Sequence, residues 1–167
     1  MKKYELTNIT KIVSGRTLYQ IKASMSFGTV IEGELGGWIE KEGNLSQDGN
    51  AWVSGDAIVS GNARVSGEAE VSGNARVSGN TRVYGDAEVF GDAWVSSNDE
   101  VLWISKIGRR LGTTTFFKSK KGIEVVCGCF LGTIEEFQSK VNATHGDSKH
   151  GEVYRHAIEI AKLQIGG

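Results

Sequence analysis

Glycine recurs at every sixth position through the middle of the chain, ten times without a break. A small residue fills a second fixed slot of each hexad, and valine fills the slot two residues later. The glycines are Gly37, Gly43, Gly49, Gly55, Gly61, Gly67, Gly73, Gly79, Gly85 and Gly91. The small residues are Ala51, Ala57, Ala63, Ala69, Ala75, Thr81, Ala87 and Ala93, and the valines are Val53, Val59, Val65, Val71, Val77, Val83, Val89 and Val95. We expect Ile39 and Leu45 to extend the small-residue slot upstream, so that the array covers residues 39–98.

Each hexad predicts one short strand followed by one corner. A small residue and a valine two positions apart point to the same side of a strand, and the residue between them points outward. Glycine followed by Asn or Asp permits the left-handed backbone conformation that a tight corner needs. Three corners close a triangle, so about 18 residues form one coil, and stacked coils share columns of alanine and valine. The period therefore predicts a β-solenoid of about three coils and excludes heptad coiled coils and calcium-binding nonapeptide arrays.

The hexads, written Ala-x-Val-x-Gly-Asn/Asp, resemble the hexapeptide repeat of left-handed parallel β-helices. The left hand is what this resemblance implies, because crossover connections between parallel strands are otherwise almost always right-handed. A right-handed solenoid is the alternative. The fold class that we expect is mainly β, a left-handed parallel β-helix with a small α+β unit at its C-terminal end.

Composition limits the partners that we expect. The chain has 23 glycines among 167 residues and no proline. Average usage is about 7% for glycine and about 5% for proline, so the glycines serve fixed positions of the repeat and do not indicate disorder. A net charge of -1 gives no global field for nucleic acid or for an anionic membrane. No stretch approaches the roughly 20 apolar residues of a membrane span, and the first residues lack the apolar core of a secretory signal. Cys127 and Cys129 are too close for an unstrained disulfide, and we expect a cytoplasmic protein.

Outward residues on one face recur every 18 positions, which divides them into three columns. These columns are Trp52, Glu70 and Glu88 on the first face, Ile58, Arg76 and Trp94 on the second, and Arg64 and Arg82 on the third; the slot after valine adds Phe90 to the first face and Tyr84 to the third. Hexapeptide-repeat proteins typically form trimers, so the resemblance implies a homotrimer in which an acidic face meets a basic one. Trp52, Phe90 and Trp94 would be its apolar anchors, or would line a ligand cleft between subunits together with Arg76. The alternative is an ordinary solvated surface.

The segments on either side of the array are expected to cover its open ends. Residues 1–38 contain strand patterns in "YELT" and "TLYQIKA". The glycine-rich entry "GELGGWIEKEGNLS", which begins in this segment and continues into the array, resembles the entry segment of hexapeptide-repeat proteins of phages and prophages. Residues 99–167 predict three strands, in "VLWISKIG" and "TTTFFKSKKGIEVVCGCF", and two helices. Thr133 caps the first helix, with Glu136 completing a capping box, and the second covers about 151–164. This unit resembles a C-terminal module of phage-encoded proteins.

Catalytic and metal sites are weakly indicated. Many hexapeptide-repeat proteins are acyltransferases with a histidine base in or near the repeat. Here His145, His150 and His156 all lie in the C-terminal unit, and the array contains no histidine. Cys127, Cys129, His145 and His150 are residue types that suit zinc, but their spacing is not typical of a zinc site. We predict no catalytic residue, no metal and no cofactor.

A basic cluster is the best candidate for ligand contact outside the array. It contains Arg109, Arg110, Thr113, Thr114, Thr115 and Phe116. Arginine forks and threonine hydroxyls beside Gly112 suit a phosphate, and Phe116 or Trp103 suits stacking on a base. The alternative is a solvated hairpin.

These patterns together favour a non-catalytic, trimeric binding protein. The resemblance to phage-encoded proteins implies an accessory protein that captures a small phosphorylated, nucleotide-like ligand or a host protein and counteracts host defence. Nucleic acid and membrane partners are not expected. An acyltransferase and a structural spacer are the alternatives.

Overall fold

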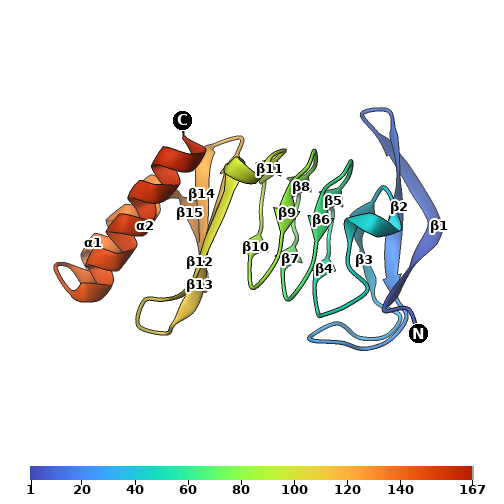
Figure 1. Ribbon diagram of the computed structural model, residues 1–167, viewed down its shortest axis with the longest axis horizontal. Coiled ribbons are helices and arrows are strands. Elements are labelled where there is room, and N and C mark those ends of the chain that lie inside the picture. The colour runs from blue at the N-terminus through green and yellow to red at the C-terminus, as the bar shows by residue number, and fades with distance from the viewer. Residues whose placement is uncertain (167) are drawn as a thin grey trace.

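Three units follow one another along the long axis of the computed structural model, which describes residues 1–166 (Figure 1). A hairpin covers one end of a stack of coils, and a sheet backed by two helices covers the other. The N-terminal strands are β1 (Tyr4–Val13), β2 (Arg16–Ala23) and β3 (Leu35–Ile39), followed by the 3-10 turn η1 (Glu42–Asn44). None of the described helices is long and apolar enough to cross a membrane.

The repeat forms a parallel β-solenoid of about three turns, as predicted. Its strands are β4 (Trp52–Val53), β5 (Ile58–Val59), β6 (Arg64–Val65), β7 (Glu70–Val71), β8 (Arg76–Val77), β9 (Arg82–Val83), β10 (Glu88–Val89) and β11 (Trp94–Val95). Parallel pairing joins residues 18 apart, so the three predicted columns are confirmed: Trp52, Glu70 and Glu88; Ile58, Arg76 and Trp94; Arg64 and Arg82. The alanine and valine columns are fully buried and form one continuous core.

The register at the start of the array differs from the expectation. Ile39 pairs with Val59 and Leu45 with Val65, so both occupy the valine slot and not the small-residue slot. The reason is an insertion, because Leu45 and Val53 are eight residues apart where later valines are six apart. The loop that absorbs the extra residues holds the N-terminus, since the side-chain oxygen Oε1 of Gln47 accepts the backbone N–H of Lys3 at 2.8 Å.

The N-terminal unit extends one face of the solenoid. Strand β2 pairs antiparallel with β1 and β3, and β3 continues in parallel with β5. The segment between β2 and β3 folds over the first coil, where Phe27 packs edge-on against Trp52 with ring centroids 5.4 Å apart. This segment buries Trp52, which we expected on the outer surface.

The C-terminal unit is a four-stranded antiparallel sheet with two helices. Its elements are η2 (Asn98–Glu100), β12 (Val101–Ile107), β13 (Gly112–Ser119), β14 (Gly122–Cys127), β15 (Phe130–Thr133), α1 (Ile134–His145) and α2 (Lys149–Ile165). The sequence predicted three of the strands and missed β15 as a separate element. The capping box of Thr133 and Glu136 is confirmed.

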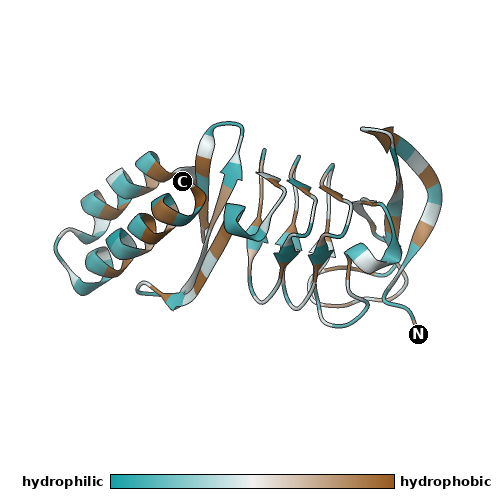
Figure 2. Cartoon of the chain, turned by 45° about the horizontal axis from the view of Figure 1, so that its top comes forward, coloured by the Kyte–Doolittle hydropathy of each residue, from teal (hydrophilic) through white to brown (hydrophobic). Residues whose placement is uncertain are grey.

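The two faces of this sheet belong to two different cores. Phe117 and Val126 complete the core of the solenoid, whereas Phe116 and Val125 pack against the helices. Both helices have hydrophobic residues on one part of their surface and hydrophilic residues on the rest (Figure 2). The sheet therefore closes the last coil and also provides the base on which the helices pack.

Candidate functional site

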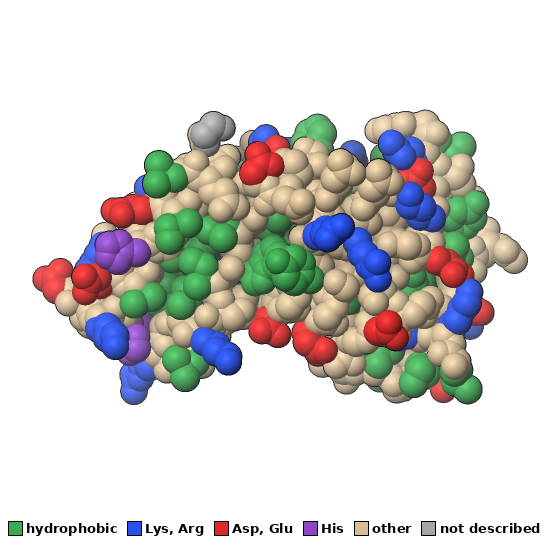
Figure 3. Space-filling view, in the orientation of Figure 1, with side chains coloured by type: hydrophobic (Ala, Val, Ile, Leu, Met, Phe, Trp, Pro, Cys, Tyr) green, Lys and Arg blue, Asp and Glu red, His purple; other side chains and the backbone are tan. Residues whose placement is uncertain are grey.

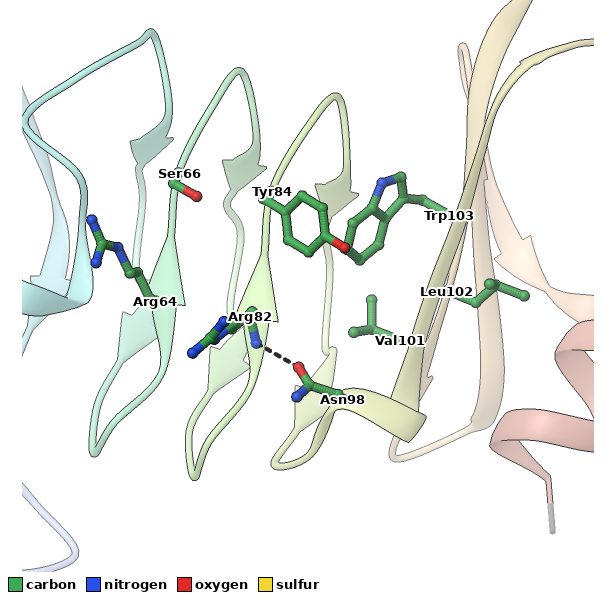
Figure 4. Close-up of a pocket in the computed structure, with 8 residues that line it drawn as sticks. All are labelled: Arg64, Ser66, Arg82, Tyr84, Asn98, Val101, Leu102 and Trp103. Carbon is green, nitrogen blue, oxygen red and sulfur yellow. Dashed lines mark hydrogen bonds between the residues drawn. The ribbon is translucent and has the colours of Figure 1, made fainter.

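A groove runs between the third face of the solenoid and the edge of the C-terminal sheet (Figure 4). It has a volume of about 830 Å³, within the range of about 300–1,000 Å³ that small-molecule sites occupy. We call it the arginine groove, and its lining residues are Arg64, Ser66, Arg82, Tyr84, Asn98, Val101, Leu102 and Trp103. The repeat contributes the first four residues, η2 contributes Asn98, and β12 contributes the rest.

Two arginines lie in register on neighbouring coils of this groove. Strands β6 and β9 pair in parallel with Arg64 opposite Arg82, and both side chains are exposed. Neighbouring strands are about 4.8 Å apart, so two like charges are held close together, which is unfavourable. Within residues 1–166, no carboxylate lies within 4.0 Å of either guanidinium group. The groove thus concentrates positive charge, and in the described part of the chain neither guanidinium group forms a direct ion pair.

Asn98 fixes the backbone at the end of the arginine column. The N–H of Arg64 donates to the carbonyl oxygen of Thr81 on the next coil, at 2.9 Å. Arg82 has no further coil beside it, and its N–H donates instead to the side-chain carbonyl oxygen of Asn98 at 2.8 Å (dashed in Figure 4). The side chain therefore replaces the backbone of a further coil and holds Arg82 in the same strand geometry as Arg64.

An aromatic pair forms the other side of the groove. The rings of Tyr84 and Trp103 are perpendicular, with centroids 4.7 Å apart. Tyr84 is 54% exposed, and Trp103 is half-buried against the solenoid core. In Figure 4 the arginine side chains lie towards the N-terminal unit and the aromatic pair lies towards the C-terminal sheet. Guanidinium groups at one side and rings at the other suit an anion that also carries a flat ring.

Basic and hydrophobic side chains also lie next to one another on the surface of the solenoid. Figure 3 shows two groups of basic side chains over the solenoid next to a hydrophobic group, and a second hydrophobic group over the C-terminal unit. The residues that line the arginine groove include no histidine, cysteine or carboxylate. The groove thus has groups that bind an anion, and its hydroxyl groups, on Ser66 and Tyr84, have no histidine or carboxylate in the lining to activate them.

The residues predicted for an inter-subunit cleft are divided between two faces. Arg76 and Trp94 lie in register on the second face, and Trp94 is 51% exposed. They line a shallow cleft that the N-terminal hairpin flanks with Lys11, whose ammonium group lies 4.1 Å from the ring centre of Trp38. Trp52 and Phe90 lie on the first face, where Trp52 is buried by the N-terminal segment and Phe90 is half-buried. The expectation that Trp52 is an exposed anchor is therefore wrong, whereas for Phe90 it stays a prediction.

The predicted basic cluster is also divided, because successive residues of a strand face opposite sides of the sheet. Thr114, Thr115 and Phe116 are buried, so the expectation that they contact a ligand is corrected. Thr114 donates to the sulfur of Cys127 at 3.2 Å, and Phe116 packs against Phe137. Thr115 faces the solenoid, where its hydroxyl accepts the backbone N–H of Glu88 at 3.1 Å.

Arg109, Arg110 and Thr113 line a second cavity, which we call the C-terminal pocket. It has a volume of about 820 Å³ and lies between the β12–β13 loop, the β14–β15 turn and α1. Its other lining residues are Glu88, Ile107, Gly112, Cys127, Gly128, Cys129, Phe130, Phe137, Lys140, Val141, Thr144, His145 and Tyr154. The structure thus brings these three predicted residues together and separates them from Trp103, which lines the arginine groove.

The residues considered for zinc do not converge. Cys127 is half-buried, Cys129 is exposed, and the rings of His145 and His150 are 6.2 Å apart. In the described part of the chain, no three His, Cys, Asp or Glu side chains are arranged to hold a metal ion. Cys127 instead contacts the hydroxyl of Tyr154 at 3.7 Å, and burial raises the pKa of that tyrosine to about 12.

The arginine groove could be predicted only in part from the sequence. The column of Arg64 and Arg82 follows from the repeat period, and Tyr84 from the slot after valine. That Trp103 lies beside Tyr84 depends on how the C-terminal sheet docks on the last coil, which no local pattern specifies.

The fold and the groove define a repeat-containing parallel β-solenoid protein with capped ends. The family model described as YdcK beta solenoid repeat matches residues 69–85, which extend from the start of β7 past the end of β9. The match supports the repeat and does not reach the terminal units. No curated protein matches the chain.

Proposed function

We propose that this protein is a non-catalytic binding protein that holds a small phosphorylated, nucleotide-like ligand in the arginine groove. The observation that supports this function is the in-register pair of Arg64 and Arg82, whose charges no nearby carboxylate balances. A phosphate group between two coils would contact both guanidinium groups and relieve their repulsion. Guanidinium forks match phosphate oxygens in geometry as well as in charge.

The aromatic pair would bind the rest of such a ligand. Tyr84 is more than half exposed, so one side of its ring is available for stacking on a base. Trp103 supports that ring edge-to-face and fixes its orientation. Stacking of a base on an aromatic side chain contributes about 1–3 kcal/mol. The lining includes the hydroxyl groups of Ser66 and Tyr84 but no histidine or carboxylate that would activate them, which supports binding without chemical conversion.

Isothermal titration with ADP tests this proposal, with pyrophosphate and adenosine as the two halves of the probe. We expect ADP to bind more tightly than either half. Replacing Arg64 and Arg82 with alanine should weaken ADP binding by at least roughly 10-fold, because a charged hydrogen bond is worth about 1.5–3 kcal/mol. Tyr84→Ala should weaken ADP binding and leave pyrophosphate binding unchanged.

The matched control is the double variant Lys120→Ala/Lys121→Ala, which removes two positive charges from a hairpin turn outside the groove. It should bind ADP as the wild type does. Equal loss in the control and in the arginine variant would mean that only net charge matters. That result, or no heat with ADP at low salt, would contradict the proposal.

We also propose that copies of the chain assemble as a homotrimer. The support is charge complementarity between the exposed Arg76 on the second face and the exposed Glu70 on the first, with Trp94 as the apolar anchor. Sedimentation equilibrium tests this assembly. Trp94→Glu should yield monomers, whereas Tyr84→Glu on the third face should not. A wild-type monomer at tens of micromolar would overturn it.

A role as a phage accessory protein that withdraws a ligand from host defence stays a prediction. Capture without turnover is compatible with it. Native mass spectrometry of the protein purified from its own cells measures the subunit number and any retained small molecule together. A retained phosphorylated compound would support the role, and a spacer function would leave the groove empty.

A further inference from the structure

The C-terminal pocket has an apolar floor. Phe137 and Val141 of α1 and Tyr154 of α2 are buried in the second core, and all three line the cavity. Ile107 and Phe130 pack against the same core from the sheet side. A ligand seated here would therefore place apolar atoms against aromatic and aliphatic side chains, which is favourable because apolar surface is removed from water.

The rim of this pocket is basic. Arg109 and Arg110 are exposed in the β12–β13 loop, and Lys140 and His145 lie opposite them on α1. Neither arginine has a carboxylate within 4.0 Å among residues 1–166. Glu88 is the one acidic residue of the lining, and burial, together with the charge of Glu70, raises its pKa. The rim therefore favours an anionic group.

The loop that carries the two arginines has an unusual backbone. Lys106 and Leu111, on either side of it, are not glycines and yet adopt left-handed conformations, with φ of 62° and 51°. Such a conformation is unfavourable for a residue with a side chain, because its Cβ atom comes too close to the following carbonyl oxygen. Gly108 has φ of 73°, and a Cβ atom there would collide with the hydroxyl of Tyr154. The packing of Tyr154 thus fixes the loop that places Arg109 and Arg110 over the pocket.

We propose that the C-terminal pocket binds a free amphipathic anion, namely a medium-chain carboxylate. Its hydrocarbon chain would lie against Phe137, Val141 and Tyr154, and its carboxylate would lie between Arg109 and Arg110. The volume of about 820 Å³ is sufficient for such a ligand. This site is separate from the arginine groove and shares no lining residue with it.

The cysteines give a readout that is specific to this pocket. The chain has two cysteines, and Cys127 and Cys129 both line the cavity. The probe is decanoate below its micelle concentration, and the measurement is the rate of iodoacetamide alkylation of each thiol by mass spectrometry. We expect saturating decanoate to slow alkylation of Cys129 at least roughly 5-fold. ADP bound in the arginine groove should leave both thiols reactive, so the two proposals fail separately.

Variants and head-group analogues test the role of charge. Arg109→Ala/Arg110→Ala should weaken decanoate at least roughly 10-fold, whereas Lys120→Ala/Lys121→Ala, an adjacent basic pair in another turn of the same sheet, should not. Thr144→Glu, at an exposed rim position of α1, should also weaken binding, and Thr144→Lys should strengthen it. Decanol and decylamine should protect the thiols less than decanoate.

Three results would overturn the proposal. The first is unchanged alkylation at saturating decanoate, and the second is equal protection by decanol or decylamine. The third is binding to phosphatidylglycerol vesicles without binding of free decanoate, which would assign the basic rim to a membrane surface. Circular dichroism of each variant establishes that a loss of binding does not reflect unfolding.

Discussion

The hydroxyl of Thr115 accepts the backbone N–H of Glu88 at 3.1 Å and so joins the C-terminal sheet to the last coil. Both groups lie where the sheet covers the solenoid, and Thr115 is buried. Beside it, Ala93 and Ser119 form a bridge between the same two units. The junction is therefore bonded through the backbone as well as packed.

Thr115→Val keeps the shape of the side chain and leaves the N–H of Glu88 without a partner. We expect a loss of about 1–3 kcal/mol in the free energy of unfolding, measured with urea, because an unpaired buried donor carries its desolvation cost. Thr17→Val, at an exposed position of β2, is the control and should change stability by less than about 0.5 kcal/mol. Similar values for both variants would show that this bond does not hold the junction.

Alanine substitutions at three glycines would distinguish the cost of backbone strain from the cost of a steric collision. Gly55 and Gly79 both have left-handed backbones, with φ of 62° and 65°, but a Cβ atom at Gly79 alone would collide with the carbonyl oxygen of Ser96. Gly55→Ala should cost about 1–2 kcal/mol, and Gly79→Ala should cost more. Gly43→Ala, which meets open space at an ordinary φ, should be nearly neutral or stabilising. Thermal unfolding checks this order, and equal losses at Gly55 and Gly79 would contradict it.

Thr81 is the exception in the alanine column, and its buried hydroxyl has no hydrogen-bond partner among residues 1–166. Thr81→Val retains the shape and removes the unpaired group, so we expect it to stabilise the protein by about 1–3 kcal/mol. The reverse change in the valine column, Val83→Thr, should destabilise it by a similar amount. A lower melting temperature for Thr81→Val would mean that the hydroxyl is bonded in solution.

Contacts of Glu40 predict that the N-terminal hairpin contributes to the free energy of unfolding in a pH-dependent way. Its carboxylate accepts the N–H of Gly61 at 2.6 Å and also pairs with Arg16, and these contacts, with the backbone hydrogen bond as the largest, hold its pKa below the usual value. The Glu40 carboxylate thus binds a proton less tightly in the folded state than in the unfolded state. Its stabilisation of the folded state is therefore present above the usual pKa of about 4.3 and is lost as the pH falls through the lower pKa of the folded state.

The test compares Glu40→Gln with wild type across that range. At pH 7 the variant should be less stable by about 1.5–3 kcal/mol, and the difference should shrink towards pH 3. Glu42→Gln removes a carboxylate from an exposed pair with Lys2 and should cost less than about 1 kcal/mol at any pH. A difference for Glu40→Gln that stays constant with pH would exclude a role for its charge.

The repeat could be predicted almost completely because each of its interactions recurs at a fixed separation. Arg64 lies opposite Arg82 for the same reason that Val65 lies opposite Val83. Trp52 obeys the same rule and points outward, but whether an outward residue meets solvent depends on what else folds over it. Only the packing of the N-terminal segment, through Phe27, decides that Trp52 is buried.

The candidate sites were less predictable for a related reason. The cluster from Arg109 to Phe116 is continuous in sequence. Successive side chains of β13 nevertheless point to opposite faces of the sheet, so Thr115 contacts the solenoid and Phe116 packs against the helices. Trp103 and Arg109 were expected to serve one ligand, and they line two separate cavities. Assigning each of these residues to its cavity requires knowing how the C-terminal sheet is positioned on the last coil.

The strand pairing and hydrogen bonds that attach the caps involve the first coil, through β5 and Gly61, and the last coil, through Glu88 and Ala93, so the length of the stack can change without altering how its ends are closed. Duplicating residues 63–80 would insert one whole turn and move the terminal units apart by about 4.8 Å. The basic column would then have a third guanidinium group, and a longer polyanion would have a matching binding surface. The length of the molecule can therefore change in evolution by one coil at a time, without changes in the terminal units.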